Sequence, residues 1–73
     1  MAISYLKLWK LLIDKRMKKT DLIEQCGIST NVLAKLGKDE AVSMDSLEKI
    51  CVALGCNIED IMEFIVHEQE DNK

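Results

Sequence analysis

The sequence predicts an all-α fold of five helices, and three observations support this prediction. Apolar residues recur at three- and four-residue intervals along most of the 73-residue chain. Several of these periodic segments follow a serine or an asparagine and precede a glycine, as helices commonly do. No alternation of polar and apolar residues is long enough to predict a strand, and no Asn-Gly or Asp-Gly pair predicts a hairpin turn.

The first helix is expected to begin near Ser4, which can serve as its N-cap, and to end at about Lys15 or Arg16. Its charged residues form one stripe, and its apolar residues line the opposite side. That apolar side consists of Leu8, Trp9, Leu12 and Ile13.

The second helix is expected over residues 19–25 and should end at Gly27, because a helix end commonly needs the positive φ that glycine adopts without strain. Lys18 occupies the position where a polar N-cap would be expected. Two alternatives remain: the cap is absent, or Thr20 caps a helix that starts later.

The third and fourth helices have clearer ends. Ser29 predicts the N-cap of a third helix over residues 30–36, which Gly37 should close. Ser43 predicts the N-cap of a fourth helix over residues 44–54, which Gly55 should close.

Asn57 predicts the N-cap of a fifth helix over about residues 58–66. One face of this helix carries Ile58, Ile61, Met62 and Ile65. Phe64 and Val66 lie off that face. They either form a contact between two copies of the chain or close the core against the first helix.

A chain of this length has room for one domain. We expect this domain to extend over residues 1–67. Residues 68–73 contain no apolar side chain and are expected to form an acidic, disordered tail.

The second and third helices, with the short turn at Gly27 between them, have the helix-turn-helix arrangement. Apolar residues at fixed distances from this glycine should form the small core that holds the two helices at a steep angle. These residues are Leu22, Cys26, Ile28, Leu33 and Leu36. The first turns of the third helix would then project from the surface, where a major groove can accept them.

Charge is distributed unevenly along the chain, although the net charge is only −3. Residues 1–20 carry six basic side chains and one acidic one, whereas residues 39–73 carry ten acidic side chains and two lysines. An anionic partner is therefore expected to approach the N-terminal half.

Other functions are disfavoured by what the sequence lacks. Lys7 and Lys10 interrupt the apolar residues at the start of the chain, so neither a signal peptide nor a membrane segment is predicted, and we expect a cytoplasmic protein. The three cysteines have no partners at metal-ligand spacing and are expected to be reduced core residues. With no glycine-rich phosphate loop and a single histidine, His67, we expect no enzyme, no cofactor and no small-molecule ligand.

Four stretches of the chain resemble the Cro/C1-type (XRE-like) helix-turn-helix family. They are residues 18–22, 26–29, 43–47 and 53–56, and the similarity extends over about residues 5–65. Residues 3–5 and 7–14 are particularly similar to the small VanU-type regulators of vancomycin-resistance gene clusters. The resemblance implies a five-helix lambda-repressor-like domain. The chain departs from the family pattern at Lys18, which replaces a polar cap, and at Ile23, where a smaller residue is usual.

The resemblance also implies which residues meet DNA. Base edges would be read by Thr30, Asn31 and Lys35, with Ser29 at the margin, and phosphates would be bound by Lys18, Lys19 and Lys38. The side chains suit these roles, because asparagine can bridge adenine N6 and N7, lysine can donate to guanine O6 or N7, and threonine offers a hydroxyl and a methyl group.

The function implied is a sequence-specific DNA-binding transcriptional regulator. We expect a repressor that binds double-stranded DNA at an inverted-repeat operator as a homodimer. The alternative is a protein-interaction module with the same fold, antitoxin-like or polymerase-binding, whose acidic C-terminal half binds a protein partner.

Overall fold

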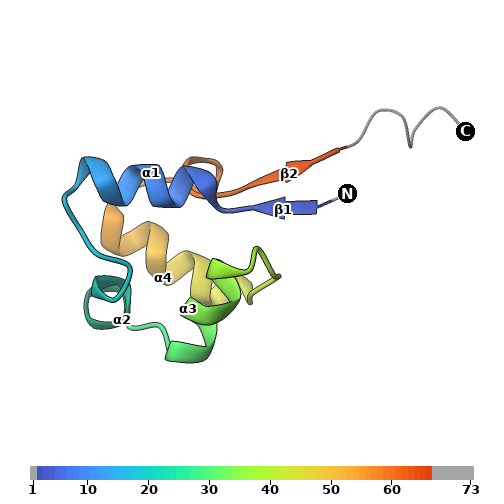
Figure 1. Ribbon diagram of the computed structural model, residues 1–73. Coiled ribbons are helices and arrows are strands. Elements are labelled where there is room, and N and C mark those ends of the chain that lie inside the picture. The colour runs from blue at the N-terminus through green and yellow to red at the C-terminus, as the bar shows by residue number, and fades with distance from the viewer. Residues whose placement is uncertain (1, 67–73) are drawn as a thin grey trace, which may run out of the picture.

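The computed structural model describes residues 2–66, and within them the chain forms four α-helices and two short strands (Figure 1). The helices are α1 (Leu6–Asp14), α2 (Asp21–Cys26), α3 (Thr30–Gly37) and α4 (Met44–Leu54). A single 3-10 turn, η1 (Ile58–Asp60), follows α4, and β1 (Ala2–Ser4) pairs antiparallel with β2 (Glu63–Ile65). The predicted helical class is confirmed, whereas the predicted number of five helices is wrong.

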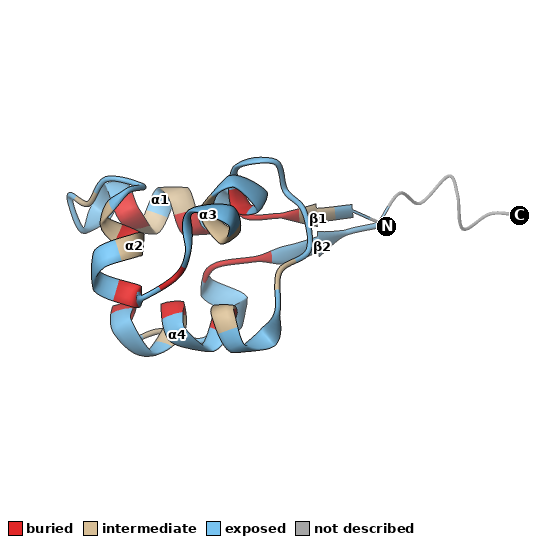
Figure 2. Ribbon diagram, turned by 90° about the horizontal axis from the view of Figure 1, so that it is seen from below, coloured by how far each residue is buried: buried red, intermediate tan, exposed pale blue. Residues whose placement is uncertain are grey.

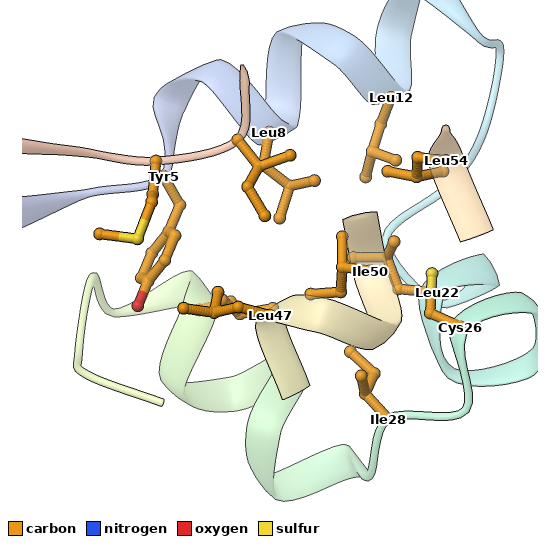
Figure 3. Packing of buried hydrophobic residues seen from close by; sticks show 12 residues of the cluster. Tyr5, Leu8, Leu12, Leu22, Cys26, Ile28, Leu47, Ile50 and Leu54 are labelled. Carbon is orange, nitrogen blue, oxygen red and sulfur yellow. The ribbon is translucent and has the colours of Figure 1, made fainter. Parts of the chain in front are cut away.

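One apolar core joins all the helices. In the view of Figure 1, α1 lies along the top, α4 crosses the middle, and α2 and α3 lie below. The buried residues lie where these elements face one another (Figures 2 and 3). The core consists of Tyr5, Leu8, Leu12, Leu22, Cys26, Ile28, Leu36, Leu47, Ile50, Leu54, Ile61 and Met62.

The core predicted around Gly27 is largely confirmed. Four of its five members are buried, and Leu33 is half-buried against the same cluster. Ile23, the large residue at a position where the family usually has a small one, is also half-buried and packs against this cluster. The molecule therefore accommodates Ile23 at the edge of its core.

Several helix ends follow the sequence prediction. The Ser29 hydroxyl accepts a hydrogen bond from the Val32 N–H at 3.2 Å, and the Ser43 hydroxyl accepts one from the Ser46 N–H at 3.1 Å. Each bond satisfies an amide that has no partner within its helix. The predicted fourth helix, residues 44–54, matches α4 at both ends.

The first two helices begin later than predicted. Ser4 lies in β1, where its hydroxyl accepts a hydrogen bond from the Leu6 N–H at 3.3 Å, and α1 starts two residues further on. Thr20 occupies the N-cap position of α2, but its side chain makes no capping bond. Instead, the Asp21 carboxylate accepts a hydrogen bond from the Lys18 N–H at 2.9 Å. Both alternatives for this helix therefore hold in part.

The third helix ends at Gly37, as predicted, but the chain takes its left-handed turn two residues later. Gly37 is the last residue of α3, and the left-handed residue is Asp39, at φ 57°. Aspartate tolerates this conformation better than most residues. Its carboxylate accepts a hydrogen bond from the Tyr5 N–H at 3.1 Å, and this tertiary contact helps to hold the turn at Asp39.

The predicted fifth helix is also wrong: residues 58–60 form a single 3-10 turn and residues 63–65 form β2. Ile61 and Met62 are both buried between these elements. A short apolar run fits helical and strand spacing equally well, so it does not decide between them. The partner strand decides, because Ala2, Ile3 and Ser4 pair with Ile65, Phe64 and Glu63.

The predicted end of the domain at residue 67 and the acidic tail over residues 68–73 lie outside the described residues. Among the residues that are described, no helix has both the length and the apolar character needed to cross a bilayer.

The two glycines Gly27 and Gly37 provide a matched test of the turn before α3. We expect Gly27→Ala to lower the free energy of unfolding by about 1 kcal/mol, because φ at Gly27 is +76°. No atom lies within 4 Å of a Cβ at either position, so neither substitution causes a clash. Gly37→Ala places alanine in a helix and should leave stability unchanged or slightly raised. Urea unfolding followed by circular dichroism measures both, and equal losses would contradict this account of Gly27.

Candidate nucleic-acid interface

The turn between α2 and α3 contains three residues with separate roles. Gly27 ends α2 in the left-handed conformation, Ile28 is buried, and Ser29 is extended and caps α3. Because Ile28 is held in the core and α2 packs against α4, the start of α3 is held at the surface. This is the helix-turn-helix geometry that the sequence predicts.

One side of α3 is exposed over its whole length. We call this side the α3 face; it consists of Thr30, Asn31, Ala34, Lys35 and Lys38. At 100° per residue these positions lie within about 140° of the helix circumference. Leu36, on the other side, is fully buried. The structure therefore brings together the three predicted base-reading residues and one predicted phosphate-binding lysine.

The lysines of the α3 face make no ion pair with a carboxylate of residues 2–66. Among these residues, the lysines that do form ion pairs are Lys7, with Glu63 at 3.8 Å, and Lys49, with Asp45 at 3.5 Å. Lys35 and Lys38 are exposed, and their ammonium groups are thus available to an anionic ligand.

Two acidic residues, Asp39 and Glu40, follow the α3 face, and part of each is engaged elsewhere. The Asp39 carboxylate accepts the Tyr5 N–H, while the Glu40 carbonyl accepts the Tyr5 hydroxyl at 2.7 Å. Burial, and secondarily the Asp39 charge, raise the pKa of Tyr5, so the phenol remains a hydrogen-bond donor at neutral pH. Together these bonds fasten the C-terminal end of α3 to the residue that follows β1.

The other two predicted phosphate-binding lysines lie on a different element. Lys18 and Lys19 are exposed in the loop before α2. The Lys19 ammonium lies 4.5 Å from the centroid of the Trp9 ring, a cation–π contact that holds its side chain against α1. The four predicted lysines therefore form two pairs, one at the start of α2 and one on α3.

The predicted role of Ser29 at the margin of base reading competes with its role as a cap. Ser29 is exposed, but its hydroxyl oxygen already accepts a hydrogen bond from the Val32 N–H. Ala34 was not among the predicted site residues, although it lies between Asn31 and Lys35 on the α3 face. Its position four residues after Thr30 is the signal that could have identified it, and its methyl group could contact a thymine methyl.

The cysteines lie away from the α3 face. Cys26 is buried in the core, and Cys51 and Cys56 are half-buried against it. Burial is the main cause that raises the pKa of all three thiols, which keeps them protonated at neutral pH.

Comparisons with known proteins agree on one family. The family model for the Cro/C1-type helix-turn-helix DNA-binding domain matches residues 7–67. An uncharacterized HTH-type transcriptional regulator of Bacillus subtilis, YozG, is 39% identical over 56 residues, which cover 74% of this chain and 67% of YozG. The crystal structure of the transcriptional regulator VanUg matches with a TM-score of 0.86 at 50% identity, and the match covers 90% of this chain and 88% of VanUg.

The cap of α3 can be tested without DNA. Ser29→Ala should lower the free energy of unfolding by about 1 kcal/mol, because the Val32 N–H loses its acceptor. Ser29→Asp is the matched control, since a carboxylate accepts the same bond and should preserve most of the stability. Urea unfolding of the two variants and the wild type makes the comparison; equal losses in both would contradict the capping role.

Proposed function

Because the chain belongs to the Cro/C1-type helix-turn-helix family of DNA-binding transcriptional regulators, we propose that it represses transcription by binding an inverted-repeat operator as a homodimer. The family resemblance predicted from the sequence is thereby confirmed, and DNA is the ligand that this fold implies. The repressor role, the form of the operator and the homodimer are the proposal. The α3 face is the observation that supports the contact with DNA on which all three depend.

We assign the reading of base edges to Thr30, Asn31 and Lys35. All three are exposed on one side of a helix whose start is held at the surface. The major groove admits an α-helix, and the asparagine amide and lysine ammonium match the acceptor and donor patterns of adenine and guanine there. Ser29 contributes mainly by capping this helix.

We assign phosphate binding to Lys18, Lys19 and Lys38. Phosphate contacts fix the position of a protein on the duplex and carry no base information of their own. Lysines on both sides of α2 and α3 suit this purpose, because the backbones of a duplex run along both sides of a groove. The Trp9 contact limits the motion of the Lys19 side chain and so reduces the entropy lost when it binds.

The proposed mechanism is occlusion of the promoter by the bound protein, with no catalytic step. One recognition helix covers only a few base pairs. Two copies related by a two-fold axis, with their recognition helices about 34 Å apart, would read two half-sites of an inverted repeat. This doubles the number of base contacts and supplies the specificity that one copy lacks.

Base reading can be tested with Asn31→Ala and Lys35→Ala. Each should weaken binding to one half-site by about 1–3 kcal/mol, roughly 5- to 150-fold, and relax the preference at one position in each half-site. Lys49→Ala is the matched control, since Lys49 is exposed on α4 and paired with Asp45. Selection of bound sequences from random DNA, followed by gel shift, measures both effects. If both variants retain the wild-type preference, the base-reading assignment is wrong.

Phosphate binding predicts a different pattern. Lys18→Ala and Lys38→Ala should weaken binding to all sequences alike and should reduce the slope of log K against log[salt] by about 1 per lost contact. Titrations at several salt concentrations, on a preferred and a scrambled duplex, separate this effect from a loss of base reading. A change of preference without a change of slope would contradict the assignment.

A further inference from the structure

A row of exposed apolar side chains runs along the second strand and its end. We call these residues the β2 patch: Phe64, Ile65 and Val66, which are 59%, 42% and 54% exposed. Successive residues of a strand point to opposite faces, so the row presents apolar groups on both sides of the sheet. Exposed apolar side chains that gather at one place, rather than lying scattered over the surface, indicate a contact surface.

Within residues 2–66, the outer edge of β2 has no neighbouring strand. The sheet that these residues form has two strands, so β2 pairs on one side only. Next to β1, Tyr5 donates hydrogen bonds to Asp39 and Glu40, so the loop that follows α3 lies close to the end of that strand. Residues along β1 become progressively more buried, whereas every residue of β2 is exposed. β2 also contains no proline or lysine, the residues that commonly protect an edge strand from pairing.

The length and charge of β2 suit pairing with its own copy. In an antiparallel pair of strands, residues that lie directly opposite each other form either a hydrogen-bonded pair or a non-hydrogen-bonded pair, and the two types of pair alternate along the strands. A strand that pairs with its copy across a two-fold axis therefore places one residue opposite itself. When all three residues of β2 pair, that residue is Phe64.

In this register no like charges face each other directly. Glu63 is the charged residue of β2, and it lies opposite Ile65 of the second copy rather than opposite the second Glu63. Each Glu63 also keeps its own counter-ion, because the Lys7 ammonium lies 3.8 Å from its carboxylate. The aromatic pair at the axis and the paired backbones then add favourable contacts that are not opposed by charge.

We infer that β2 is the dimerisation strand of this protein: two copies pair their β2 strands antiparallel about a two-fold axis at Phe64 and form a continuous four-stranded sheet. The inference rests on the proposed homodimer and identifies its surface. A sheet of two three-residue strands has only marginal stability by itself in water, whereas a sheet of four strands is more stable. Both views place the strands at the end of the molecule opposite α2 (Figures 1 and 2), which leaves the α3 face open to DNA.

The test compares full-length variants by sedimentation equilibrium. Phe64→Glu should raise the dimer dissociation constant by roughly 30-fold or more, because it places two carboxylates at the axis. Val52→Glu is the matched control, since Val52 is 74% exposed on α4, outside the sheet, and should leave the dimer unchanged. Circular dichroism checks that each variant is folded. If Phe64→Glu proves unfolded, Phe64→Ser takes its place in the same comparison.

A mixing experiment tests the position of the axis. Phe64→Lys should also be monomeric, but an equal mixture with Phe64→Glu should form a heterodimer, because residue 64 of one copy faces residue 64 of the other. Dimers of Phe64→Glu as stable as those of the wild type, or no dimer in the mixture, would overturn the inference.

DNA binding separates this inference from the proposed function. Monomeric Phe64→Glu should bind a single half-site with unchanged base preference and should lose the extra affinity for an inverted repeat. A wild-type protein that is monomeric both free and on its preferred DNA overturns the dimer surface and leaves the α3 assignment standing. A dimer that depends on Phe64 but has no preference among DNA sequences supports the surface and overturns the proposed function.

Discussion

The arrangement of this molecule depends on how α2 is held against α4. Leu22 on α2 and Ile50 on α4 are both fully buried in the same core (Figure 3). Gly27 turns the chain immediately after α2, and Ile28 returns it to that core. Because a closely packed core resists small displacements, α3 has no freedom to sink into the molecule. The core behind α3 therefore fixes the position of the helix backbone that carries the side chains proposed to read bases.

The ends of the described chain contribute a second constraint. β1 and β2 bring residues 2–4 beside residues 63–65, and Tyr5 then bonds to the loop after α3 with both its backbone amide and its hydroxyl. The same small region thus closes the core, fastens the C-terminal end of α3 and exposes the β2 patch. The β2 patch and the α3 face are therefore connected through a few hydrogen bonds.

The candidate site was largely predictable because it depends on local signals. Ser29 indicates where α3 starts, and Gly27 indicates where α2 ends. The helical period then places Thr30, Asn31 and Lys35 on one side of α3. Ala34 was missed because a methyl group has no distinctive chemistry in a sequence. The contact of Lys19 with Trp9 was missed because it joins two elements whose relative position is set by packing. The helix-turn-helix family itself was recognisable from short stretches that all lie in or beside α2, α3 and α4.

By itself, the sequence determined the helical class, the turn between α2 and α3, and both ends of α4, since capping and the positive φ of glycine act within a few residues. Tertiary structure alone decided that residues 63–65 form a strand, that Asp39 rather than Gly37 takes the left-handed turn, and that Ser4 belongs to a sheet. Each of these outcomes depends on a partner distant in the sequence: Glu63 meets Ser4, and Tyr5 meets Asp39. An apolar run that satisfies two periodicities adopts whichever structure its partner can hydrogen-bond, and that partner is known only once the chain has folded.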